Sequence, residues 1–116
     1  MRLQGLEDAR YAFIDVETTG FHPSYARVVE LACIVVEHRQ VTASLETLID
    51  PQIPIPRFAT EIHGITDARV RGKPSLEAIR DQLLAQCREA TVVAHNAPFD
   101  LSFLPFLRSR PIACSY

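Results

Sequence analysis

Two acidic residues stand two positions apart in an apolar run near the start of the chain, and this pattern constrains the fold more than any other. The sequence YAFIDVETTG at residues 11–20 is typical of a buried strand that ends at a glycine. Because side chains alternate between the two faces of a strand, Asp15 and Glu17 project from the same face. Two unit charges about 4 Å apart repel by about 4 kcal/mol at the effective dielectric of a protein surface. A hard divalent cation such as Mg²⁺ or Mn²⁺ would relieve that repulsion.

An alternative interpretation is that Asp15 and Glu17 are solvated residues on the exposed face of an edge strand. The apolar residues around them favour instead a strand that is buried on both faces, because Tyr11, Phe13 and Val16 alternate with no clear polar face. Buried strands seldom carry acids without a partner. We therefore expect the two carboxylates to be metal ligands.

Composition limits the class of protein. A chain of 116 residues with 47% hydrophobic content predicts one globular domain, with residues 1–10 as a polar lead-in and residues 11–116 as the domain. The formal net charge of −2 argues against unspecific coating of duplex nucleic acid. Three cysteines without a C-x-x-C pair predict reduced core residues and no zinc site. No apolar run approaches the roughly 20 residues of a membrane span, so we expect a cytoplasmic protein without membrane contact.

The remaining pattern predicts an α/β fold with a mixed sheet. Three consecutive segments rich in β-branched residues predict an antiparallel meander, at residues 11–18, 28–36 and 41–49. Three prolines at residues 50–56 then stop the sheet from growing. Two short apolar segments predict further strands, at residues 91–95 and 111–114.

Helices are predicted between and after these strands. A short helix over residues 57–62 ends at Gly64, and residues 65–70 form another helical turn with Thr66 as its cap. Pro74 opens a longer packing helix, and Pro98 lies in the first turn of a last, strongly apolar helix. Asp100 therefore lies near a helix N-terminus.

Three separate stretches carry polar residues to the places where strands end and helices begin. Ligands of α/β proteins usually bind at that edge of the sheet. The stretches are DVETTG at residues 15–20, HGIT at residues 63–66 and HNAPFD at residues 95–100.

In their order and spacing these stretches resemble the DEDD family of 3′-to-5′ exonucleases, in particular the DEDDh branch typified by the proofreading epsilon subunit of bacterial DNA polymerase III. The resemblance extends over residues 11–110. It implies a ribonuclease H-like mixed sheet flanked by helices, and removal of nucleotides from DNA 3′ ends with two Mg²⁺ or Mn²⁺ ions. The partners that it implies are a single-stranded or frayed 3′ end and a DNA polymerase subunit.

The resemblance also implies a role for each matching residue. Asp15 would bridge two metal ions, Glu17 would bind one of them and the terminal 3′-OH, and Asp100 would hold the second. Two such ions can activate a water molecule and stabilise the leaving oxygen. The strand end would contact the other motif residues, with bases stacked on Phe99 or Ile65: Thr18, Thr19, Gly20, His63, Ile65, Asn96 and Phe99.

Four basic residues surround the HGIT stretch and are candidates for phosphate contacts, with a solvated helix face as the alternative: Arg57, Arg69, Arg71 and Lys73. The family's third motif, which brings a general-base histidine and a fourth acidic ligand, has no counterpart, because residues 101–116 contain no His, Asp or Glu. We therefore expect the chain to be the N-terminal two thirds of a catalytic domain, C-terminally incomplete, with weak metal binding and slow or absent hydrolysis.

Two other functions are compatible with the same residues. One is an RNA-trimming or oligonucleotide-degrading exonuclease of the same family, since contacts to a ribose 2′-OH cannot be read from the sequence. The other is a catalytically dead module that binds a strand end or a polymerase partner. The missing third motif favours this last function, and the intact first and second motifs argue against it.

Overall fold

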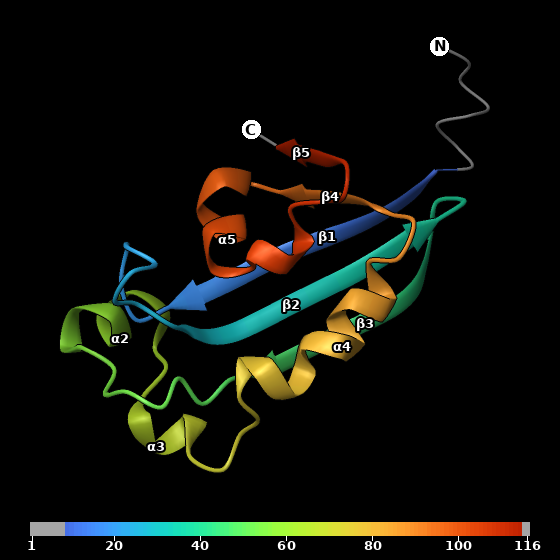
Figure 1. The fold of residues 1–116 in the computed structure, drawn as a ribbon. Coiled ribbons are helices and arrows are strands. Elements are labelled where there is room, and N and C mark those ends of the chain that lie inside the picture. Colours follow the sequence, from blue (N-terminus) through green and yellow to red (C-terminus); the bar gives the residue numbers. More distant parts are fainter. Residues whose placement is uncertain (1–8, 115–116) are drawn as a thin grey trace.

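The computed structural model describes residues 9–114, which form a five-stranded sheet in the order β3-β2-β1-β4-β5 (Figure 1). Residues 1–8 of the predicted lead-in lie outside the described residues, and residue 10 already belongs to the first strand. The strands are β1 (Arg10–Thr18), β2 (Val28–Glu37), β3 (Gln40–Leu48), β4 (Thr91–Ala94) and β5 (Ile112–Cys114).

The predicted α/β mixed sheet is confirmed. β1, β2 and β3 pair antiparallel as a meander, whereas β4 runs parallel to β1 and β5 runs parallel to β4. Parallel neighbours need a crossover, and the segment between β3 and β4 supplies it with three helices. These are α2 (Arg57–His63), α3 (Asp67–Val70) and α4 (Leu76–Gln86).

Local side-chain chemistry fixes where the helices begin and end. Gly64, with φ of 76°, ends α2 in the left-handed region that glycine adopts most easily. The hydroxyl of Thr66 accepts a hydrogen bond at the start of α3, and that of Ser75 does the same for α4. The last helix, α5 (Ala97–Phe103), stops before Pro105, which opens a short 3₁₀ helix, η1 (Pro105–Leu107).

The main core lies on one face of the sheet. On β1 the buried residues alternate as Ala12, Ile14 and Val16. Helices α4 and α5 lie over the same side of the sheet in Figure 1, and Ile79 of α4 and Leu101 of α5 belong to the same apolar cluster as these strand residues. Burying this face supplies most of the apolar contact that holds the fold together.

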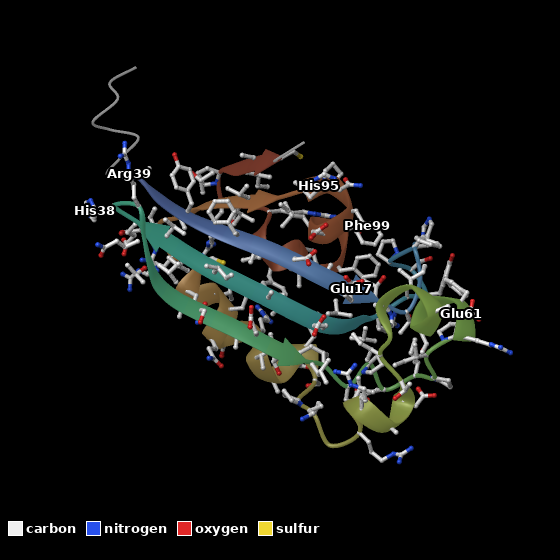
Figure 2. All side chains as sticks on the ribbon, turned by 180° about the vertical axis from the view of Figure 1, so that it is seen from behind. Glu17, His38, Arg39, Glu61, His95 and Phe99 are labelled. Carbon is white, nitrogen blue, oxygen red and sulfur yellow. The ribbon has the colours of Figure 1, made fainter. Side chains whose placement is uncertain are left out.

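The other face of the sheet is open in the part of the chain that the structure describes. In Figure 2, which looks at the molecule from behind, no helix lies over the middle of the strands. Phe13 is 44% exposed, and Asp15 is exposed beside it. The expectation that β1 is buried on both faces is therefore wrong, because alternation of apolar residues cannot tell whether a second layer covers the sheet.

A second, smaller apolar cluster holds the connector, α2 and α3 at the end of the sheet. It consists of Val29, Ile55, Ala59, Ile65 and Val70, and Leu48 packs against it. These residues form a cluster separate from the main core, and α2 packs on this small cluster.

Two further expectations from composition can be compared with the structure. Within residues 9–114, no helix combines the length and the apolar character needed to cross a bilayer. Cys33 and Cys87 are buried free thiols, as predicted. Cys114 is exposed, because β5 lies at the edge of the sheet and its residues are all exposed.

Candidate active site

The carboxyl end of β1 extends beyond its neighbour β4. β4 pairs with β1 only over Tyr11, Ala12 and Phe13, so the following five residues of β1 have β2 as their only strand partner. Asp15 and Glu17 lie in this extension, and the alternation of buried residues places both on the same face, as predicted; that face is the open one.

A network of hydrogen bonds holds the turn that follows Glu17. The hydroxyl of Thr18 donates to the Gly20 carbonyl (2.6 Å). The backbone N–H of Thr19 donates to the Arg27 carbonyl (2.8 Å), and the N–H of Arg27 donates to the Thr19 hydroxyl (2.9 Å). Thr19 is 3% exposed, so its side chain supports the turn from inside instead of facing a substrate.

The start of α5 brings Asp100 to the same place. The side chain of Asn96 caps the helix by accepting from the N–H of Phe99 (3.4 Å), and Asp100 lies in the first turn with only 6% exposure. The backbone N–H groups of Val16 and of Asp100 itself lie close enough to this carboxylate to lower its pKa, against the rise that burial causes. Because Val16 stands between Asp15 and Glu17, the structure brings together the three acidic residues that the sequence predicted for the site.

Burial and neighbouring charges shift the pKa values of Glu17 and Asp100. Burial raises the pKa of Asp100 to about 6, the charge of Asp15 adds to this rise, and Glu17 contributes less. Burial also raises the pKa of Glu17, and the charges of Asp15 and, to a smaller extent, Glu30 raise it further. Glu30 is the residue directly opposite Glu17 on β2. The site therefore holds an excess of negative charge.

The donor set fits a hard divalent cation by its chemistry. Among residues 9–114, no three His, Cys, Asp or Glu side chains stand at the mutual spacing of ligands around one ion. Carboxylate oxygens are nevertheless the ligands that Mg²⁺ and Mn²⁺ prefer, and the charge of Asp15 raises the pKa of both Glu17 and Asp100, as expected for acids that lie close together.

A pocket of about 190 Å³ opens beside Glu17. Its floor is the end of β1 with Glu17 and Thr18, and its walls are largely apolar. Phe21 and Phe58 stack with ring centroids 5.9 Å apart, and both are exposed. The remaining lining residues are Val16, Gly20, Ala59, Ile62, His63 and Phe99.

The sequence reasoning missed Phe21, Phe58 and Ile62 as pocket residues. Their signal was present but weak: Phe21 directly follows the glycine of the turn, and Phe58 and Ile62 are four residues apart on one short helix. Large apolar residues that stay 68%, 46% and 67% exposed, respectively, mark a contact surface when they cluster.

The other residues predicted for substrate contact differ in their surroundings. Ile65 is 2% exposed and belongs to the small apolar cluster, so it offers no surface for a base to stack on. Phe99 is partly buried and lines the pocket, and Asn96 is exposed. Figure 2 shows Glu17, Phe99 and His95 at the same end of the sheet, with His38 and Arg39 at the opposite end.

Three of the four basic residues that the sequence offered as candidates for phosphate contacts have other partners or surroundings in the structure. Arg57 pairs with Glu61 on the exposed side of the helix (3.2 Å), and Arg69 donates to the Gly64 carbonyl (3.4 Å). Arg71 lines a separate depression against the proline-rich connector.

Comparison with known proteins identifies the class of the fold and then the family of the chain. The fold is the ribonuclease H-like fold of exonucleases. E. coli exonuclease I in complex with a dA16 oligonucleotide superposes over 91% of this chain and 28% of its own, with a TM-score of 0.79 and 19% identity. Exonuclease X in complex with 5′ overhanging duplex DNA superposes over 90% of this chain and 58% of its own, with a TM-score of 0.68 and 30% identity.

The sequence defines the family. The RNase T exonuclease family matches residues 12–109, and the chain belongs to this family. The PolC-type DNA polymerase III of Halalkalibacterium halodurans is 36% identical over 99 residues, and that of Streptococcus suis is equally similar. Each match covers 85% of this chain and 7% of the relative, so the chain spans a small part of the length of these polymerases.

Proposed function

We propose that this exonuclease domain removes nucleotides from the 3′ end of a DNA strand, with Mg²⁺ or Mn²⁺ held by Asp15, Glu17 and Asp100. The observation that carries the proposal is the position of Asp100, which is 6% exposed and so close to the end of β1 that Asp15, the N–H of Val16 and Glu17 all influence its pKa. Acids from two distant parts of the chain thus meet at one strand end.

Each carboxylate has its own part in this proposal. Asp15, the most exposed of the three, and Glu17, which also lines the pocket, would hold the ions from the side of β1. Asp100, buried in the first turn of α5, would hold an ion from the other side, directly or through water. When bound, the two ions supply a nucleophilic water at neutral pH and stabilise charge on the leaving oxygen.

The pocket beside Glu17 is proposed to receive the last nucleotide of the strand. Stacking on apolar and aromatic side chains holds bases of any sequence, and Phe21, Phe58 and Phe99 offer such surfaces here. These residues replace Ile65 as the stacking surface. A site that grips one strand end needs few phosphate contacts, which agrees with the net charge of −2.

The relatives support a role in DNA replication. The DNA polymerase III proteins of PolC type contain a stretch similar to this chain, and the exonuclease I and exonuclease X neighbours carry DNA in their structures. We therefore propose single-stranded or frayed DNA as substrate and a DNA polymerase as partner.

The test is hydrolysis of a 5′-labelled single-stranded DNA oligonucleotide in Mn²⁺. Because residues 101–116 offer no general-base histidine, the chain is expected to give only a slowly forming ladder of products shortened from the 3′ end. Asp15→Asn and Asp100→Asn are expected to reduce product formation to the level of buffer. Asp81→Asn, on the exposed face of α4, is the matched control and should leave the ladder unchanged.

Three results would change the proposal. Faster shortening of RNA than of DNA would favour the RNA-trimming alternative. Binding of the oligonucleotide without any Mn²⁺-dependent shortening would favour a strand-end binding module. Shortening that survives in Asp15→Asn would show that the carboxylates of β1 do not carry the reaction.

A further inference from the structure

We propose that His63 is a positioning residue, which ties α2 to the carboxyl end of β1 and so sets the shape of the pocket beside Glu17. The proposal rests on the proposed function, because it takes that pocket as the place where the strand end binds. It assigns His63 a part different from the substrate contact that the sequence resemblance implied.

Both ring nitrogens of His63 are engaged inside the protein. Nδ1 accepts a hydrogen bond from the backbone N–H of Ile65 (3.1 Å), so Nδ1 carries no proton. Nε2 lies 3.0 Å from the carbonyl oxygen of Thr18, which can only accept, so Nε2 carries the proton and donates. These two bonds fix the neutral ring with its proton on Nε2, and they leave no ring nitrogen for a substrate.

The bond from Nε2 joins the two sides of the pocket. His63 is the last residue of α2, and Thr18, 45 positions earlier, is the last residue of β1. Phe58 and Ile62 of α2 form the apolar wall, and Glu17 stands next to Thr18 on the other side. The distance between the wall and the carboxylate therefore depends on this hydrogen bond.

Besides this bond, α2 contacts the turn after β1 through the stack of Phe58 on Phe21, which are both exposed. A helix of seven residues is too short to be stable alone, and the buried residue of α2, Ala59, packs into the small apolar cluster and not into the main core. Thr60 also stabilises the turn after α2, because its hydroxyl donates to the Ile65 carbonyl (2.7 Å), but this bond stays within the turn.

Thr60 therefore offers a matched control for variants of His63. The amide oxygen of Asn can accept from the Ile65 N–H in place of Nδ1, but the Asn side chain cannot reach Thr18. His63→Asn therefore keeps the turn after α2 and removes the hydrogen bond to the Thr18 carbonyl. The amide nitrogen of Gln can replace Nε2, so His63→Gln should restore the tie. Thr60→Val weakens the same turn and leaves the bond to Thr18 in place.

The first measurement is binding of deoxyadenosine 5′-monophosphate in Mn²⁺. We expect His63→Asn to weaken binding about tenfold, the loss of one hydrogen bond of about 1.4 kcal/mol. His63→Gln should bind within about threefold of the unchanged chain, and Thr60→Val should bind as tightly as that chain although it unfolds more easily. Equal binding by His63→Asn, or equal weakening by Thr60→Val, would overturn the proposal.

The second measurement separates this proposal from the proposed function. Amide hydrogen exchange at Thr19, whose N–H is bonded to the Arg27 carbonyl, should be about tenfold faster in His63→Asn and unchanged in Thr60→Val. The imidazole ¹⁵N spectrum should show a protonated Nε2 for His63. If no variant binds the nucleotide but the faster exchange at Thr19 and the protonated Nε2 are both observed, the proposed function is wrong and the positioning role of His63 is supported. If either of these two results is absent, the positioning role is wrong.

Discussion

At the scale of single residues, Asp100 shows how burial, charge and hydrogen bonding act on one group. Its pKa is raised to about 6 by burial and by the charge of Asp15, against the pull of two backbone hydrogen bonds. The folded chain therefore binds this proton more tightly than the unfolded chain does, so its contribution to stability is present at low pH. That contribution is lost as the pH rises through about 6.

The first prediction concerns the pH dependence of stability in EDTA. Because an amide in place of the carboxyl group cannot ionise, we expect Asp100→Asn to gain about 2 kcal/mol in the free energy of unfolding, relative to the unchanged chain, between about pH 4 and about pH 7.5. Urea denaturation at several pH values measures this difference. Asp81→Asn, at an exposed position, should have the same pH dependence of the free energy of unfolding as the unchanged chain. If the difference in this free energy between Asp100→Asn and the unchanged chain did not vary with pH, the raised pKa of Asp100 would be contradicted.

The second prediction concerns metal binding. A cation that binds only the folded chain raises the free energy of unfolding by about 2.7 kcal/mol when its concentration is 100-fold above the dissociation constant. Mn²⁺ should therefore raise the melting temperature of the unchanged chain and of Asp81→Asn, and should leave that of Asp15→Asn unchanged. The effect should fade below about pH 6, where Asp100 takes up its proton. Scanning calorimetry with and without Mn²⁺ measures these melting temperatures. An equal rise in the melting temperature of Asp15→Asn would exclude Asp15 as a ligand.

At the scale of elements, α2 depends on how it ends. Gly64 adopts φ of 76°, and an added Cβ would meet no heavy atom within 4 Å. A substitution there is therefore penalised by backbone conformation and not by collision.

The third prediction follows from this geometry. Gly64→Ala should lower the free energy of unfolding by about 1 kcal/mol, because alanine tolerates the left-handed region poorly. Gly64→Asn should lower the free energy of unfolding less than Gly64→Ala does, since asparagine adopts the left-handed region more readily than alanine. Chemical denaturation of the unchanged chain and the two variants gives the order of their free energies of unfolding. Equal stability of the Ala and Asn variants would mean that the positive φ at residue 64 does not cause the loss of stability.

The elements that rest on local rules could be predicted from the sequence. The alternation around Asp15 and Glu17, the cap formed by Thr66 and the end of α2 at Gly64 each follow from a few neighbouring residues. The meeting of Asp100 with β1 required the family resemblance, because nothing local relates two segments 85 residues apart in the chain (100 − 15).

Features that depend on packing between distant segments were beyond the sequence reasoning. Ile65 follows the same motif as His63, yet its side chain turns into the small apolar cluster. Phe21 and Phe58 form one wall only because a loop and a helix meet in space. The exposure of Phe13 depends on whether a second layer covers the sheet, which strand alternation does not encode.

At the scale of the whole molecule, the sheet carries its core on one side only. The open face presents apolar residues from neighbouring strands, since Phe13 pairs with Ile34 on β2 and with Val93 on β4. Phe13 is 44% exposed, and Val41 at the edge strand is 65% exposed. Contiguous apolar surface of this kind favours association.

The fourth prediction is that the 116-residue chain self-associates through this face. Sedimentation velocity should show an average mass that rises with protein concentration, and Phe13→Lys should shift that rise to about tenfold higher concentration. Ile53→Lys, which removes an exposed apolar residue from the connector, is the control and should not shift it. A single monomeric boundary at all concentrations would show that the face stays free.

The separate apolar cluster beneath α2 has a consequence for how such a domain diversifies. Because the wall of the pocket packs on the cluster of Ile55, Ala59 and Val70, and not on the main core that holds α4 and α5 to the sheet, the two clusters can accumulate changes independently. Selection on the choice of substrate can therefore change residues 53–73 while Asp15, Glu17 and Asp100 keep an unaltered scaffold.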